Sequence, residues 1–153
     1  RPIVYIAPTS PKLLLATNSG SFILDERGKA LIDAGQVADV GKLQLPTLQD
    51  QSGLRIKPGQ IAVPSSAVGF ITTMVRQLQA KGQVVETLSL PTSAYELDMK
   101  PAGVGYYVKF NLHETNVEQQ VGAYLAVRQR LQSQGITPAQ YVDVRLGGRA
   151  YYK

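Results

Sequence analysis

Two stretches of the chain carry apolar residues at every third or fourth position, the spacing that places them on one face of an α-helix. The first stretch follows Pro64, and Ser65 or Ser66 is expected to be its N-cap. Gly82 is expected to end this helix in the left-handed conformation. The predicted apolar face consists of Val68, Ile71, Val75 and Leu78.

The second helical stretch begins with a capping-box pattern, in which Thr115 is followed three residues later by Glu118. Gly135 and Pro138 are expected to end it. Its apolar face comprises Val117, Val121, Tyr124 or Leu125, the aliphatic part of Arg128, and Leu131. Both helices are therefore predicted to pack one face against a hydrophobic core.

Alternation of apolar and polar residues predicts strands in the rest of the chain. The clearest pair, 94–100 and 105–112, flanks a turn at 101–104 and directs one set of side chains to the core: Tyr95, Leu97, Met99, Tyr106, Val108, Phe110 and Leu112. Further strands are predicted at 2–7, 21–24, 29–32, 83–90, 141–146 and 149–152, with a short strand near 43–45 inside a long connection, 34–63. The segment Asp25-Glu26-Arg27-Gly28 is expected to form a tight turn between two of them.

The order of these elements is strands, helix, three strands, helix and hairpin. Short turns between successive strands favour antiparallel pairing. We therefore predict a single α+β domain over residues 1–153, with a mostly antiparallel β-sheet, two main helices on one face and a C-terminal β-hairpin.

The predicted hairpin has two different faces. Val142, Val144 and Leu146 are expected to face the core, while Asp143 and Arg145 lie on the other face as a charge pair. With a two-residue Gly-Gly turn at 147–148, Arg145 would lie opposite the small residue Ala150, and its guanidinium would reach outward. The last strand would then have only one pairing neighbour.

Composition narrows the possible chemistry. The 153 residues are 44% hydrophobic and include no cysteine and one histidine, which excludes disulfides, thiolate metal sites and cysteine nucleophiles. The 16 Lys and Arg residues exceed the 11 Asp and Glu residues, giving a net charge of +5. No apolar run approaches the ~20 residues needed to cross a bilayer.

Candidate catalytic groups are few, and each has a simpler structural interpretation. His113 could act as a general base, but no nucleophile is assigned to it, and an exposed loop histidine is favoured. Glu96 and Asp98 share one face of a strand, as the paired carboxylates of a glycosidase would, but exposed strand faces are commonly charged. The Gly103-Val104-Gly105 segment fits a hairpin turn. We predict no catalytic residue, cofactor, metal site or small-molecule substrate.

Charge is concentrated at the C-terminal end. The last thirty residues contain five basic residues and one aspartate, a net charge of +4, interleaved with tyrosines. Such a surface could bind a single strand of nucleic acid, protect a sheet edge from aggregation, or bind an acidic extended segment at an open edge. The hairpin pattern favours the third interpretation, and nucleic-acid binding remains the alternative.

The C-terminal sequence YVDVRLGGRAYYK resembles the end of the β domain of the FtsQ/DivIB cell-division proteins, with Asp143, Val144 and Arg145 matching its core motif. The segment Gly20–Ala30 is similar to the family's strand and Asp-x-x-Gly turn, and Leu45–Leu48 to its Leu-Pro-x-Leu segment. Arg1–Val4 resembles the end of a preceding POTRA module, which would place residues 1–8 in its tail. The chain departs from the family pattern at Leu112-His113, where a glycine is usual, and at Leu146, where a tyrosine is usual.

The resemblance implies a non-enzymatic scaffold of the division septum on the extracytoplasmic face of the bacterial cell membrane. Its implied partners are small coiled-coil proteins of the FtsB/DivIC and FtsL types, and an FtsB/DivIC segment would add a strand to the last β-strand. In this family the arginine matching Arg145 pairs with an acidic partner residue. The predicted contact residues are Arg145, Leu146, Gly148, Arg149, Ala150 and Tyr152, with Tyr124 and Arg128 nearby.

The chain begins at Arg1 rather than at a methionine, so we expect it to be a fragment or a processed form. The resemblance implies that one transmembrane helix precedes it in the full-length protein. No nucleic acid is expected as a partner under this interpretation.

Overall fold

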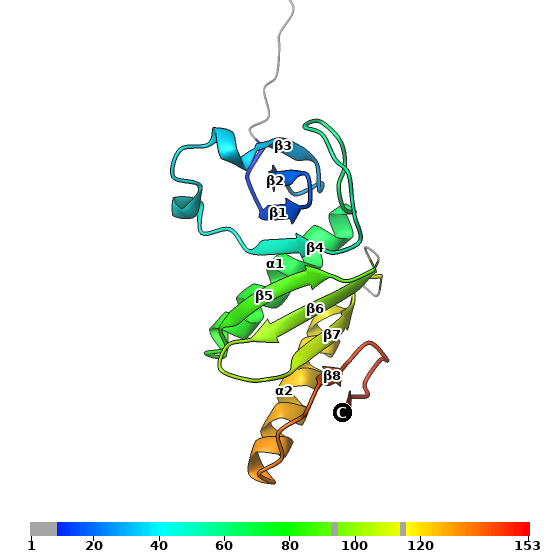
Figure 1. Cartoon of the computed structure of the whole chain (residues 1–153). Helices are drawn as coiled ribbons and strands as arrows, with labels where there is room; N and C mark the ends of the chain where they lie inside the picture. The colour runs from blue at the N-terminus through cyan, green and yellow to red at the C-terminus, as the bar shows by residue number, and fades with distance from the viewer. Residues whose placement is uncertain (1–8, 93–94, 114–115) are drawn as a thin grey trace, which may run out of the picture.

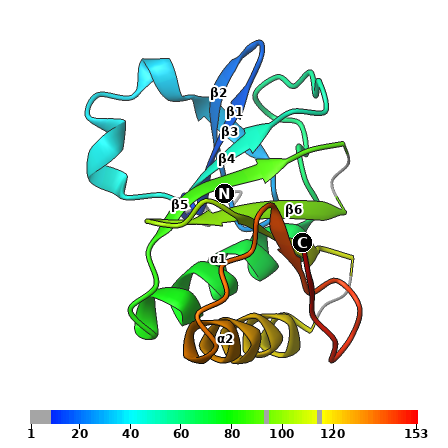
Figure 2. The same cartoon turned by 60° about the horizontal axis from the view of Figure 1, so that its bottom comes forward.

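The computed structural model describes residues 9–92, 95–113 and 116–153. Across these residues the chain forms a nine-stranded sheet in the order β3-β2-β1-β4-β5-β6-β7-β8-β9, with helices α1 (Ser65–Ala80) and α2 (Val117–Ser133) on one face (Figure 1, Figure 2). The strands are β1 (Leu13–Thr17), β2 (Gly20–Leu24), β3 (Ala30–Asp33), β4 (Thr47–Asp50), β5 (Val85–Leu90), β6 (Glu96–Pro101), β7 (Tyr107–Asn111), β8 (Tyr141–Asp143) and β9 (Tyr151–Tyr152). The predicted α+β class and C-terminal hairpin are confirmed.

The sheet is mixed but mostly antiparallel. In the described part of the chain, five neighbouring strand pairs are antiparallel and three, β1–β4, β4–β5 and β7–β8, are parallel. A parallel pair needs a long crossover between its strands. Helix α1 forms the crossover from β4 to β5, and α2 forms the one from β7 to β8. Both crossovers return over the same face, which places the two helices in one layer.

The core lies between this helix layer and the sheet. The alternation predicted for β6 and β7 is confirmed, because Leu97, Met99, Val108 and Phe110 are at most 1% exposed. Tyr95 was predicted to share their face, but it is 58% exposed because β6 begins only at the next residue. The buried residues of α1 are Ala67, Val68, Phe70, Ile71, Met74, Val75 and Leu78, and those of α2 are Val117, Gln120, Val121, Tyr124 and Leu131.

The N-caps of both helices differ from the predicted ones. Pro64 is the N-cap of α1, and Ser65 is already helical, so the prediction of a serine cap is wrong. Proline's fixed φ and missing N–H suit a position where the backbone donor would have no helical partner. In α2 the N-cap is Asn116, whose side chain accepts a hydrogen bond from the N–H of Gln119. Thr115 lies outside the described residues. The glycine stop predicted for α1 is confirmed, since Gly82 has a φ of +71°.

The long connection contains a strand that sequence reasoning placed too early. Residues 43–45 form no strand; Val40–Leu43 is a 3₁₀-helix and the strand is β4, at Thr47–Asp50. Leu48 is completely buried, and β4 lies in the middle of the sheet between β1 and β5. A single large apolar residue in four gave this central strand little signal in the sequence. The strand predicted at 2–7 lies outside the described residues.

The start of the β3 edge of the sheet is covered by the chain itself. Gly28, with a φ of +76°, closes the predicted turn, and its carbonyl accepts a hydrogen bond from the N–H of Ala62. Ala30 donates its N–H to the carbonyl of Gln60 and accepts a hydrogen bond from the N–H of Gly59. The segment 59–62 therefore occupies positions where another strand would pair.

Candidate partner-binding site at the C-terminal edge

The C-terminal hairpin forms with a register one residue different from the predicted one. Val142 lies opposite Tyr152, and Asp143 lies opposite Tyr151. The prediction that Arg145 lies opposite Ala150 is wrong, because β8 ends at Asp143 and β9 begins at Tyr151. The residues between the two strands form a seven-residue loop, 144–150.

The conformation of the Gly-Gly turn explains why the strands separate. The N–H of Arg149 donates to the carbonyl of Leu146, which closes a β-turn, and Gly148 has a φ of +70° while Gly147 has no positive φ. A positive φ only at the second central residue is typical of a type II turn. Type II turns splay the strands that they join, whereas the primed turns allow pairing up to the turn. The predicted turn residues are correct, but they do not extend the ladder.

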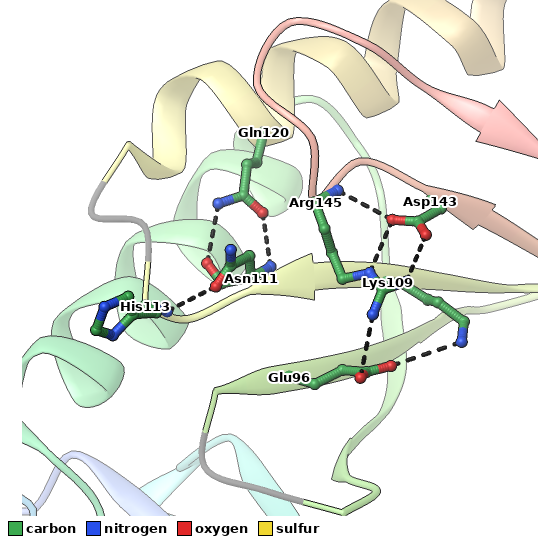
Figure 3. A network of polar contacts seen from close by, with 7 residues as sticks. All are labelled: Glu96, Lys109, Asn111, His113, Gln120, Asp143 and Arg145. Carbon is green, nitrogen blue, oxygen red and sulfur yellow. Dashed lines mark hydrogen bonds and ion pairs between the residues drawn. The ribbon is translucent and has the colours of Figure 1, made fainter.

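Arg145 folds back onto the sheet rather than reaching outward (Figure 3). Its Nε donates to Oδ1 of Asp143 at 3.0 Å, and its Nη2 donates to Oδ2 at 2.7 Å. Its Nη1 lies 3.2 Å from Oε2 of Glu96 on β6. Burial alone would raise the pKa of Asp143, but the hydrogen bonds from Arg145 outweigh it and hold that pKa below its ordinary value. Arg145 therefore forms an ion-pair bridge between β8 and β6.

Lys109 on β7 completes this network between the two strands. Its Nζ lies 3.5 Å from Oε1 of Glu96, and 5.0 Å and 5.5 Å from the ring centroids of Tyr141 and Tyr107. Burial alone would lower the pKa of Lys109, but the charges around it outweigh this effect and raise it. The amine is therefore held on three sides by groups that favour its charged form.

The same face of the sheet carries Asp98, one of whose carboxylate oxygens lacks a hydrogen-bond partner in the described part of the chain. It lies opposite Lys109 in the β6–β7 ladder, yet its Oδ1 is buried with no hydrogen-bond partner among the described residues. Burial, and then the nearby charge of Glu96, raise its pKa. Two cations, Lys109 and Arg145, thus meet three carboxylates here, so the network has a net charge of −1 when all its groups are ionised.

The backbone of β9 has an open side. Lys153 and Tyr141 exchange both backbone hydrogen bonds, at 3.0 and 3.3 Å. Hydrogen-bonded and non-hydrogen-bonded pairs alternate along an antiparallel ladder, so the next pair, Val142 and Tyr152, is a non-hydrogen-bonded one. The N–H and C=O of Tyr152 therefore point away from β8. Strand β9 ends the sheet, and no described residue covers these two groups.

Most of the predicted contact residues lie in or beside this edge. Leu146 is 59% exposed and Tyr152 is 49% exposed; Gly148 and Arg149 are exposed, and Ala150 is partly buried. The prediction that Leu146 faces the core is wrong, because the chain leaves the sheet two residues earlier. Tyr151, which was not predicted as a contact, is as exposed as Tyr152.

Two predicted contact residues do not belong to this surface. Tyr124 is completely buried under the sheet, where burial raises the pKa of its phenol, so it offers no surface to a partner. Arg128 donates to Gln132 one helical turn away and lines a hollow with Lys81 and Gln83 at the end of α1. The helical period correctly predicts that Tyr124 faces the core, which is incompatible with the contact role predicted for it.

Sequence reasoning missed the residue that ties α2 to this end of the sheet. The side chain of Gln120, 4% exposed, accepts from the N–H of Asn111 at 2.8 Å and donates to its carbonyl at 2.9 Å (Figure 3). The neighbouring Gln119 lies beside the loop, because a Cβ added at Gly148 would be 3.5 Å from its Nε2. A glutamine in the apolar stripe of a helix is the signal that could have indicated this role.

The other candidates of the sequence occupy ordinary structural positions. The N–H of His113 donates to Oδ1 of Asn111, and the centroids of the His113 and Tyr95 rings lie 5.2 Å apart with the rings nearly perpendicular. Glu96 is committed to the ion pairs described above, and Gly103 has a φ of +77° in a turn. In the three described ranges, no group of three or more histidine or acidic side chains is placed to hold a metal ion.

The chain matches no protein-family model and no curated protein sequence. Within the part of the chain that the structure describes, no helix has the length and apolar character needed to cross a bilayer.

Proposed function

We propose that this chain is a non-enzymatic interaction domain that binds an extended acidic segment by adding it as a strand to β9. The observation that carries the proposal is the open side of β9, where the N–H and C=O of Tyr152 point away from β8. An added strand would pair with these groups, and backbone pairing of this kind gives affinity without a deep cleft. The exposed side chains of Leu146, Tyr151 and Tyr152 supply apolar and aromatic area beside the edge.

Charge supports an acidic partner over a second copy of the chain. Arg149 and Lys153 lie on either side of Tyr151 and Tyr152, and residues 144–153 contain no acidic residue. A second β9 would bring the same positive charges against this edge, and like charges across an interface oppose binding. An extended segment carrying Asp or Glu would instead be attracted.

The biological role that we propose is that of an FtsQ/DivIB-type scaffold in septum formation. Support comes from the sequence resemblance and from the position of its motif: Asp143 and Arg145 stand at the end of β8, directly before the open strand. The partner would be the C-terminal segment of an FtsB/DivIC-like coiled-coil protein, with an FtsL-like protein in the same assembly. The domain would then work on the extracytoplasmic face of the bacterial membrane, held by a helix elsewhere in the full-length protein.

A proline at Tyr152 tests strand addition. Tyr152→Pro removes the outward N–H without removing a hydrogen bond to β8, whereas Tyr152→Val removes the same aromatic ring and keeps the N–H. We expect calorimetric titration with the C-terminal segment of the FtsB/DivIC-like protein of the same genome to show roughly tenfold weaker binding to the proline variant than to the valine variant. Equal affinities of the two variants would contradict strand addition.

The alternative interpretation has its own measurement. A nucleic-acid-binding surface would bind a single-stranded oligonucleotide with an affinity that falls steeply as salt concentration rises. Oligonucleotide binding together with no binding of the acidic segment would replace the proposed function with this alternative.

A further inference from the structure

We infer that recognition of the partner's carboxylates belongs to Arg149 and Lys153, whereas Arg145 is a positioning residue that holds the start of the 144–150 loop. This inference rests on the proposed function and specifies which charges at that site select the partner. It separates two roles that the sequence resemblance assigns to one arginine.

The surroundings of Arg145 leave it little capacity to attract an acidic segment. Three of its nitrogens already contact carboxylate oxygens: Nε and Nη2 contact Asp143, and Nη1 contacts Glu96. Its side chain is 36% exposed, and the network to which it belongs, with Lys109 and Asp98 included, has a net charge of −1 when all its groups are ionised. A carboxylate approaching Arg145 would meet more negative than positive charge, so the guanidinium is not the source of the attraction.

Arg149 and Lys153 have the opposite surroundings. Both are exposed, and neither makes an ion pair with any residue in the described ranges. Lys153 lies two residues after Tyr151, on the same face of the hairpin, because side chains alternate along a strand. Arg149 follows the Gly-Gly turn two residues before Tyr151. The two cations thus flank the open backbone of β9, within a Debye length of an added strand.

The contacts of Arg145 suit a positioning role. Asp143 also accepts a hydrogen bond from the backbone N–H of Arg145 at 3.0 Å, so this carboxylate fixes both the main chain and the side chain where β8 ends. The bond to Glu96 then ties this point across β7 to β6. Val144, between the two charged residues, is completely buried. The loop therefore leaves the sheet from a fixed point, which reduces the ordering that partner binding requires.

The test compares two variants of the whole chain against two peptides. One variant is Arg145→Gln, and the other combines Arg149→Gln with Lys153→Gln. One peptide is the acidic C-terminal segment of the FtsB/DivIC-like protein of the same genome, and the other is that segment with Asn and Gln in place of Asp and Glu. Calorimetry at two salt concentrations gives the affinities, and amide hydrogen exchange reports on residues 150–153.

We expect the double variant to bind the acidic peptide roughly fivefold to tenfold more weakly than the wild type does, with little dependence on salt. It should bind the amide peptide with the affinity of the wild type. We expect Arg145→Gln to weaken binding of both peptides by the same factor and to speed exchange at 150–153 more than in β5 or β6. A merely structural role for Arg145 would instead speed exchange throughout the sheet.

Two results would overturn the inference. In the first, Arg145→Gln weakens binding of the acidic peptide only, while the double variant binds it with wild-type affinity. Arg145 would then recognise the carboxylates, and the proposed function would stand. If the wild type binds neither peptide, the proposed function and this inference both fall.

Discussion

The two edges of the sheet are finished in opposite ways. At the β3 edge, Gly59 and Gln60 pair with the backbone of Ala30, and Ala62 pairs with Gly28. At the β9 edge, the N–H and C=O of Tyr152 face outward, and no described residue pairs with them. Unpaired edges invite unwanted association, so proteins usually cover or shorten them.

This difference indicates that the exposure of β9 is a specific feature of the fold rather than a general property of its edges. Part of the long connection pairs with the start of β3, whereas β9 is a two-residue strand near Arg149 and Lys153 whose outward backbone groups pair with no described residue. A short edge with positive charge resists self-association and still accepts a strand of suitable charge.

Gly28→Ala should disrupt the pairing between segment 59–62 and the start of β3. A Cβ at this position would lie 1.9 Å from the carbonyl oxygen of Val63, in a residue whose φ is +76°. We expect the free energy of unfolding in urea to fall by about 3 kcal/mol, with faster amide exchange at Ala30 and Ala62. Gly103→Ala is the matched control, because its φ is +77° and no atom lies within 4 Å of the added methyl group. It should cost about 1 kcal/mol, and equal losses in the two variants would show that the close approach to Val63 does not matter.

Asp143→Asn should loosen the base of the open edge. The carboxylate accepts three hydrogen bonds from Arg145, and its loss should lower the free energy of unfolding at pH 7 by about 1–2 kcal/mol. Because the folded pKa of Asp143 lies below its ordinary value of 3.8, this stabilisation is present above that value and disappears as the pH falls through the folded pKa. In urea unfolding, the difference between wild type and Asp143→Asn should therefore shrink as the pH is lowered from 7 to 2.5.

Asp39→Asn is the control for that measurement. Asp39 also pairs with a cation, Lys42, at 2.7 Å, but both side chains are mostly exposed. Exposed ion pairs contribute little, so this change should alter the free energy of unfolding by less than about 0.5 kcal/mol. A loss as large as that of Asp143→Asn would mean that burial of the Arg145 network contributes nothing.

Asp98→Asn should have the opposite sign. Its folded pKa is raised, so the unfolded chain ionises first as the pH increases, and the folded state loses relative stability until the folded pKa has been passed. Replacing the carboxylate by a neutral amide should therefore raise the free energy of unfolding at pH 7 by about 1 kcal/mol. The gain should vanish below pH 3.8, and destabilisation at pH 7 would show that Asp98 has an ionic partner.

Tyr152→Pro should have the smallest effect on stability. The N–H that it removes faces away from β8, so we expect a change below about 0.5 kcal/mol in the free energy of unfolding. Tyr151→Pro is its neighbour control, because the ladder directs the N–H of Tyr151 towards Asp143. It should detach β9, seen as faster exchange at Asp143 and Lys153, while Tyr152→Pro leaves these amides protected.

Local patterns predicted the fold where alternation or helical spacing was strong. The alternation in β6 and β7, the two helical stripes and the Gly28 turn each follow from neighbouring residues, and the structure contains them. Strand β4 was misplaced because only Leu48 marks it, and its central position depends on pairing with β1 and β5. Such pairing between distant segments leaves no periodic pattern of apolar residues in the local sequence.

The candidate site was predictable in location but not in detail. Basic and aromatic residues at the end of the chain indicated the open edge, and Tyr152 and Arg149 lie there. The register depended on the φ angles of two glycines, which are free to adopt either sign. The direction of Arg145 depended on Glu96, which is distant in the sequence and lies on the far side of β7 in the sheet.

The two-residue length of β9 also limits how long a segment bound to it would stay in place. An added strand can form only a few backbone hydrogen bonds with so short an edge, each contributing about 1 kcal/mol net, while association itself costs several kcal/mol. A segment bound through this edge alone would dissociate quickly. A lasting complex would need a second, linked point of attachment, because a tethered segment that leaves the edge rebinds from a high local concentration. The shortness of β9 therefore suits a contact that acts together with a second, linked attachment.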